Sequence, residues 1–195
     1  MNWLTFSALI VFAASSAGAQ TIESAFTDFH LKKCRHTPGK VEEDYGEWRC
    51  KGYANIPIYM TAGDQRVMIS FGPRADKEPA ARQTLASFNG EGKRIEWRID
   101  KISGKAFATI MRWSTTKPGD NGDPIPGEMM VVTRLPPGAV CHVGYVDGLA
   151  NKSADELARE IADKQARAFR CGQDKPVVLG EKGLGFSELY DFNEN

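Results

Sequence analysis

Four cysteines carry the clearest chemistry in this chain of 195 residues: Cys34, Cys50, Cys141 and Cys171. Cysteines can hold zinc, act as nucleophiles or form disulfides. No C-x-x-C pair occurs, and the spacing fits no zinc finger. An even number of cysteines is typical of disulfides in exported proteins. Of the three possible pairings we favour Cys34–Cys50, which closes a polar loop, and Cys141–Cys171, which ties a central strand to the last helix.

Three histidines are the candidate acid–base and metal-binding groups: His30, His36 and His142. His142 directly follows Cys141, but adjacent residues on a strand point to opposite faces of the sheet, which argues against a Cys–His pair. We expect His142 to be a half-buried residue on the same side as the apolar row of its strand. For His30 and His36 we expect no more than adventitious metal binding, so we assign no metal site.

Other short motifs are poor matches to known sites. Ser114-x-x-Lys117 has the spacing of the penicillin-binding proteins, but it falls at a strand end and lacks the S-D-N and K-T-G partners. The stretch 120–123, Asp-Asn-Gly-Asp, lacks the order of a calcium loop and predicts a solvated hairpin loop. The glycines of 180–185 lack the strand–turn–helix context of a phosphate loop. We therefore expect no cofactor and lean against an enzyme.

Tryptophan, tyrosine and arginine are the usual anchors of protein interfaces. Five of them fall on predicted strands and form a speculative interaction face: Tyr59, Arg66, Trp97, Arg98 and Trp113. The alternative is that the tryptophans are simply core residues.

The elements that must position these residues follow from periodicity and turn signals. Helical spacing predicts helices at 20–33, 76–87 and 153–170, the last with a capping box at Ser153 and Glu156. Alternation and turns predict strands at 47–53, 56–61, 66–72, 94–100, 105–114, 129–135 and 140–146. Loops are expected at 34–46 and 115–127. The pattern predicts an α+β fold: a single antiparallel sheet of six or seven strands with two or three helices packed on one face.

Residues 1–19 predict an export signal, an apolar run that ends in Ala17-Gly18-Ala19. Residues 20–195 form a single predicted domain, with the tail 175–195 partly ordered. Its 25 basic and 25 acidic residues balance, and no run of five like charges occurs. We therefore expect no nucleic-acid partner and, after signal cleavage, no membrane span.

Several stretches carry a resemblance that covers most of the mature chain: 48–53, 56–59, 63–66, 70–72, 107–113, 141–147 and 158–162. Together they resemble small exported proteins of alphaproteobacteria for which no activity is known. The resemblance implies a Gram-negative periplasm and transfers no catalytic residue.

We therefore expect a periplasmic or secreted, non-catalytic protein that binds another protein or an envelope component. One alternative is a periplasmic hydrolase whose site assembles only in the fold. The other is an inhibitor of an envelope-degrading enzyme that acts through the disulfide-held loop 34–50. A cleft that holds His142 with a carboxylate and a hydroxyl within hydrogen-bond reach would favour the hydrolase.

The small-residue motif predicts that the mature chain begins at Gln20, because signal peptidase cleaves after an A-x-A sequence. N-terminal sequencing and intact mass of the exported protein check this prediction. A full-length chain retained in the inner membrane would contradict it.

Overall fold

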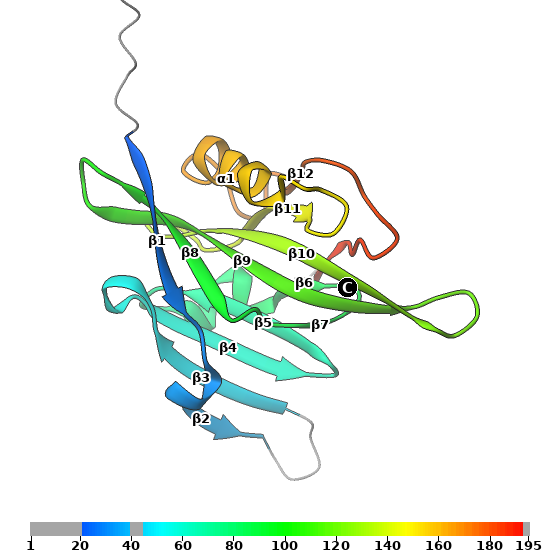
Figure 1. Cartoon of the computed structure of the whole chain (residues 1–195). Coiled ribbons are helices and arrows are strands. Elements are labelled where there is room, and N and C mark those ends of the chain that lie inside the picture. Colours follow the sequence, from blue (N-terminus) through cyan, green and yellow to red (C-terminus); the bar gives the residue numbers. More distant parts are fainter. Residues whose placement is uncertain (1–20, 40–44, 193–195) are drawn as a thin grey trace, which may run out of the picture.

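A seven-stranded sheet lies between a helix and a second sheet in the computed structural model, which describes residues 21–39 and 45–192. Figure 1 shows α1 on one side of this large sheet and β2–β5 on the other. The predicted signal segment 1–19 lies outside the described residues. The single-sheet α+β prediction is wrong, because the described chain is mostly strand and contains one α-helix and three sheets.

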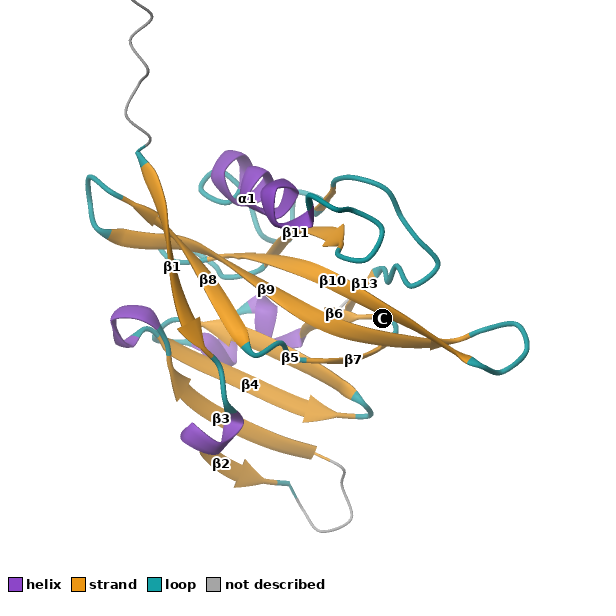
Figure 2. Cartoon of the chain, viewed as in Figure 1, coloured by secondary structure: helices purple, strands orange, loops and turns teal. Residues whose placement is uncertain are grey.

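The large sheet is mixed rather than antiparallel, since its last pair, β11 with β12, is parallel. Its strands run in the order β1 (Ile22–Asp28), β8 (Arg94–Asp100), β9 (Lys105–Pro118), β10 (Pro124–Arg134), β11 (His142–Asp147) and β12 (Val177–Val178), and β7 (Phe88–Gly90) also pairs with β9. The predicted loop 115–127 is therefore mostly strand, and only 119–123 turn at the tip of the long β9–β10 hairpin (Figure 2).

The other strands form two smaller sheets. The four-stranded sheet is a meander of β2 (Arg35–Pro38), β3 (Tyr45–Lys51), β4 (Pro57–Gly63) and β5 (Arg66–Phe71). The two-stranded sheet pairs β6 (Gln83–Leu85) with β13 (Leu189–Asp191). Short 3₁₀ turns occupy Leu31–Lys33, Tyr53–Asn55, Ala75–Lys77 and Pro79–Arg82.

Central strands of the large sheet are buried on both faces. One face packs against β4 and β5 and contributes Ile95, Trp97, Met111, Trp113, Val131 and Tyr145. The other face packs against the helix and contributes Ala108, Ile110, Met130, Val132 and Val146. Near-continuous apolar runs such as 107–111 and 129–132 are typical of strands that are covered on both sides. The prediction of a single sheet with helices packed on one face is therefore wrong, because the other face packs against a second sheet.

Two of the three predicted helices are absent from the described residues. The described part of the predicted helix 20–33, residues 21–33, forms β1 and one 3₁₀ turn. Strand β1 pairs with β8, and Thr27 Oγ1 accepts a 2.8 Å hydrogen bond from Trp97 Nε1. Segment 76–87 forms 3₁₀ turns and β6. There the backbone N–H of Ala80 donates to Val140 O, so the segment bonds to a neighbouring chain segment rather than continuing an α-helix.

The third predicted helix is present as α1 (Ala154–Gln165), shorter than 153–170. Ser153 precedes it as predicted, but its side chain makes no capping hydrogen bond. The apolar face of α1 contributes Ala158, Ile161 and Ala162 to the core. No helix among the described residues is long and apolar enough to cross a membrane.

A buried ion-pair network joins α1 to the large sheet. Arg98 donates to both carboxylate oxygens of Asp163 on α1, at 2.9 and 2.7 Å. Glu96 accepts a 2.7 Å hydrogen bond from Nε of Arg159, also on α1. Both strand residues are nearly inaccessible to solvent. Buried charges are tolerated when they are paired in this way, and these pairs link α1 directly to β8.

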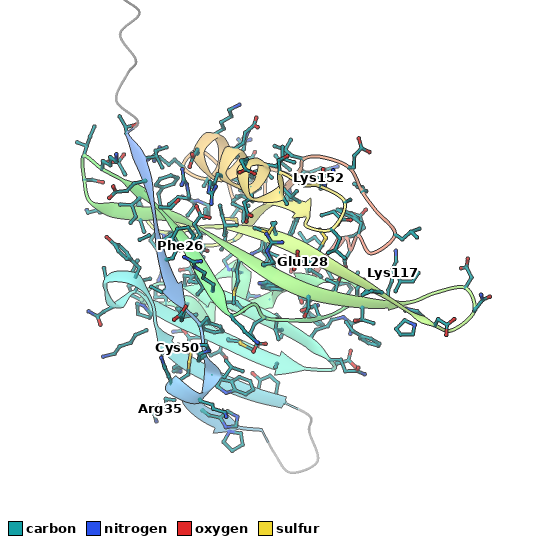
Figure 3. All side chains as sticks on the ribbon, viewed as in Figure 1. Phe26, Arg35, Cys50, Lys117, Glu128 and Lys152 are labelled. Atoms are coloured by element: carbon teal, nitrogen blue, oxygen red, sulfur yellow. A yellow bond between two sulfur atoms is a disulfide. The ribbon has the colours of Figure 1, made fainter. Side chains whose placement is uncertain are left out.

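Both disulfides have the favoured pairing, Cys34–Cys50 and Cys141–Cys171. The first bridge connects the turn after β1 to β3 in the four-stranded sheet, and Cys50 is labelled in Figure 3. The second connects the residue before β11 to the segment after α1, and Cys141 is fully buried.

We predict that the double variant Cys141→Ser/Cys171→Ser loses more stability than Cys34→Ser/Cys50→Ser. Each bridge contributes roughly 3–4 kcal/mol by loop closure, but only the second pins the segment after α1 to a core strand. Thermal midpoints of the two double variants measure the ranking, and non-reducing peptide mapping of the wild type confirms the pairing. A larger drop for the first variant would contradict the prediction.

Candidate functional site

The five residues of the predicted interaction face do not share an exposed surface. Trp97 and Trp113 are buried in the core between the two larger sheets. Arg98 is buried on the opposite face of the large sheet, paired with Asp163. Tyr59 is buried on β4, and half-buried Arg66 donates to Ala86 O from β5. The tryptophans are thus core residues, the alternative that the sequence left open.

The other candidate residues from the sequence lie apart from one another. Ser114 and Lys117 lie three positions apart on β9, so they point to opposite faces of the hairpin and cannot act together. His36 stacks on Trp48 with ring centroids 4.6 Å apart. The described residues hold no group of three or more His, Cys, Asp or Glu arranged to bind a metal ion.

His142 lies at the largest of the cavities that the candidate residues line. This edge cavity, about 680 Å³, is bounded by β11, the Cys141–Cys171 bridge, the 3₁₀ turn before β6 and the C-terminal segment. We define it by its base, His142 and Tyr145, and its exposed mouth, Arg82 and Lys175. Its walls include Phe169 from the helix side and Phe186 from the C-terminal segment.

The cavity exists because β11 is incompletely covered at its edge. The partner strand β12 pairs only with Gly144 and Tyr145, so the residues that precede them have no neighbouring strand on the side away from β10. Side chains satisfy the backbone there instead: Gln83 Oε1 accepts from the His142 N–H at 2.9 Å, and Glu78 Oε2 accepts from the Val140 N–H at 3.0 Å. The side chains of Gln83 and Glu78 each reach one point on the edge of β11 and do not cover it as a strand would, so a cavity remains along this edge.

The C-terminal segment closes the cavity from outside. Figure 1 shows it passing from β12 around the end of the large sheet to β6. Gly144 allows the close crossing, because a Cβ there would lie 2.6 Å from Val177 O. Asp147 Oδ2 accepts from the Gly183 N–H at 2.9 Å, and the Asn151 amide bonds the backbone of Glu181 in both directions.

A β-bulge determines which way His142 points. The register of β10 with β11 shifts at Val132/Thr133, so His142 pairs with Thr133 while Gly144 pairs with Val132. The bulge resets the alternation and turns His142 away from the helix-side row that includes Val146. His142 therefore lies on the side of Val140 and Tyr145 and not of Val146, so the expected row is broken by the bulge, and the residue is fully buried, only 1 % exposed, rather than half-buried.

The His142 ring is held on one side only. Its Nδ1 lies 2.9 Å from Thr133 Oγ1. The ring packs edge-on against Trp113 and Tyr145, with centroids 5.6 and 6.1 Å away. Its Nε2 has no hydrogen-bond partner among the described residues. Burial lowers the pKa of His142 to about 4, so the imidazole is neutral at pH 7.

Tyr145 completes a polar but uncharged base. Its hydroxyl is buried and, like His142 Nε2, has no hydrogen-bond partner in the described chain. Burial raises the pKa of Tyr145 well above its usual value, which keeps the phenol protonated. An unsatisfied buried polar group costs about 1–3 kcal/mol. Buried polar groups without a partner call for an explanation, and a ligand that reached the base of the cavity would supply the missing hydrogen bonds.

Charge at the mouth is dominated by two cations. Arg82 and Lys175 are exposed and enter no ion pair in the described part of the chain. Of the acidic residues that line the cavity, Asp174 pairs with Arg170 and Glu188 with Lys182, whereas Asp191 accepts from the uncharged Gln83 amide within the cavity and lies close enough to act on His142 and Tyr145. The two cations outnumber the single carboxylate of Asp191, so the exposed mouth favours an anion.

Sequence reasoning found His142 but missed Tyr145, Arg82 and Lys175. The cysteine neighbour of His142 drew attention to it, and no comparable signal marks the others. Comparison of the chain with models of protein families, with curated proteins and with solved structures yields no match.

We predict that His142 makes the protein less stable in mild acid. Its folded pKa of about 4 lies below the unfolded value of about 6.5. Between these values the unfolded state binds more protons, so the free energy of unfolding falls as pH falls from 6.5 to 4 and is fully recovered above pH 6.5.

Urea titrations at pH 7 and pH 5 of the wild type and of His142→Phe isolate this effect. The wild type should lose about 2 kcal/mol more than the variant between the two pH values, because phenylalanine does not titrate. Equal losses would show that His142 is not held neutral by burial.

Proposed function

We propose that this protein is an exported, non-catalytic binding protein of the bacterial cell envelope, and that its ligand occupies the edge cavity. The observation that carries the proposal is the pair of unpartnered polar groups, His142 Nε2 and Tyr145 OH, at the base of a cavity of about 680 Å³. Pockets that bind small molecules are typically apolar with a few convergent polar groups.

Export is supported by the two disulfides, which persist in oxidising compartments such as the periplasm. It is further supported by the signal-like segment 1–19 and by the resemblance to exported alphaproteobacterial proteins. A periplasmic location would expose the cavity to small molecules that enter the envelope.

Binding is favoured over hydrolysis by the environment of His142. A hydroxyl, Thr133 Oγ1, lies within hydrogen-bond reach of the ring. The nearby carboxylate, Asp191, instead accepts a 3.1 Å hydrogen bond from Gln83 Nε2. A general base works best with a pKa near the working pH, whereas burial holds His142 far below it.

The alternative of an inhibitor that acts through the loop 34–50 stays a prediction. Much of that segment forms β2 and β3 in the four-stranded sheet. Residues 40–44, between these two strands, lie outside the described residues.

Native mass spectrometry of protein purified gently from the periplasm tests the proposal. The wild type is expected to carry a small-molecule mass that denaturation releases. The variant Ala139→Phe, which fills the cavity from its lining, should lose that mass. A matched variant at an exposed position outside the cavity, Ala168→Phe, should retain it. The proposal would be contradicted if Ala139→Phe kept the bound mass, or if the wild type carried no such mass.

A further inference from the structure

The protonation of His142 follows from its partner. The Thr133 hydroxyl has one proton to donate, and His142 Nδ1 is its partner among the described residues. A buried hydroxyl proton needs an acceptor, so Nδ1 accepts and the ring proton resides on Nε2. The base of the edge cavity therefore presents an N–H from His142 beside the O–H of Tyr145.

Two neutral donors at a buried base select a hydrogen-bond acceptor. A neutral carbonyl-type oxygen accepts from both donors without the large cost of bringing a full charge into a buried site. A carboxylate placed there would pay that cost, because neither His142 nor Tyr145 carries a positive charge to offset it. The inner end of the ligand is thus uncharged.

The mouth has the opposite requirement. Arg82 and Lys175 remain accessible to water and have no ion-pair partner in the described chain. An anionic group placed between them gains charge-assisted contacts while staying partly hydrated. Between mouth and base, the rings of Phe169 and Phe186 supply apolar wall.

We propose, on the basis of the function proposed above, that the edge cavity takes a small organic anion with an apolar body and a carbonyl-type acceptor at the end remote from its charge. The charged group lies between Arg82 and Lys175, the body lies between Phe169 and Phe186, and the remote oxygen accepts hydrogen bonds from His142 and Tyr145. This assignment goes beyond binding as such, because it names which chemical group each end of the cavity recognises.

Three matched probes test the two ends separately. The first, 4-acetylbenzoate, has both groups; 4-ethylbenzoate lacks the carbonyl, and 4-acetylbenzamide lacks the charge. Titration calorimetry with the full mature protein should show tightest binding for 4-acetylbenzoate. Each missing group should weaken binding about tenfold, the size of one good hydrogen bond or charge contact. The preference over 4-acetylbenzamide should shrink at high salt, because the mouth is exposed.

Variants assign each preference to its end. Tyr145→Phe should reduce the preference for 4-acetylbenzoate over 4-ethylbenzoate without lowering the thermal midpoint, because it removes an unpartnered hydroxyl. The exposed double variant Arg82→Gln/Lys175→Gln should abolish the preference over 4-acetylbenzamide. Arg94→Gln, which removes an exposed cation on β8 outside the cavity, is the matched control and should leave both preferences unchanged.

The outcomes separate this inference from the proposed function. Equal affinity for the three probes, or no binding of 4-acetylbenzoate at millimolar concentration, would overturn the ligand class. If the native protein still carried a mass that Ala139→Phe loses, binding in the cavity would stand. Preferences that the Arg94→Gln control changes as much as the mouth variant would also overturn the assignment of the anion to Arg82 and Lys175.

Discussion

Burial of the central strands on both faces is the constraint on which the rest of this structure depends. Residues of β9 and β10 alternate between two cores, one shared with β4 and β5 and one shared with α1. Charged side chains on these faces must therefore be paired within the protein. Glu96 and Arg98 satisfy this requirement through Arg159 and Asp163, so ion pairs as well as apolar packing connect α1 to the sheet.

The same constraint explains why the candidate site lies at the edge of the sheet. In the middle, strands on both sides satisfy the backbone and both layers cover the side chains. At β11 the covering strand shrinks to two residues, and Gln83 and Glu78 take over the backbone hydrogen bonds. His142 and Tyr145, whose polar atoms are costly to bury in the centre of the sheet, are enclosed here by the C-terminal segment rather than by a packed layer.

Sequence reasoning succeeded where the signal was local. The cysteine pairing followed from short closures around Cys34–Cys50 and from the expected contact of the last helix with a strand. Sequence reasoning failed where one local pattern fits both a helix and a strand. The spacing of Ile22, Ala25 and Phe26 suits a helix, but the segment forms an edge strand because β8 offers it backbone hydrogen-bond partners. The bulge beside His142 leaves no trace in residue types. Arg82, Tyr145 and Lys175 meet only through the path of the C-terminal segment, which no periodicity predicts.

The path of the C-terminal segment gives this part of the chain a different role from the strands of the two cores. The last residues, from Val177 onward, contribute one wall of the cavity but few members of either core. Substitutions in this stretch can therefore reshape what the cavity accepts while the two cores stay intact. Selection on stability and selection on the cavity therefore overlap at Tyr145, which belongs to both the core and the base of the cavity, and they overlap less in the C-terminal segment.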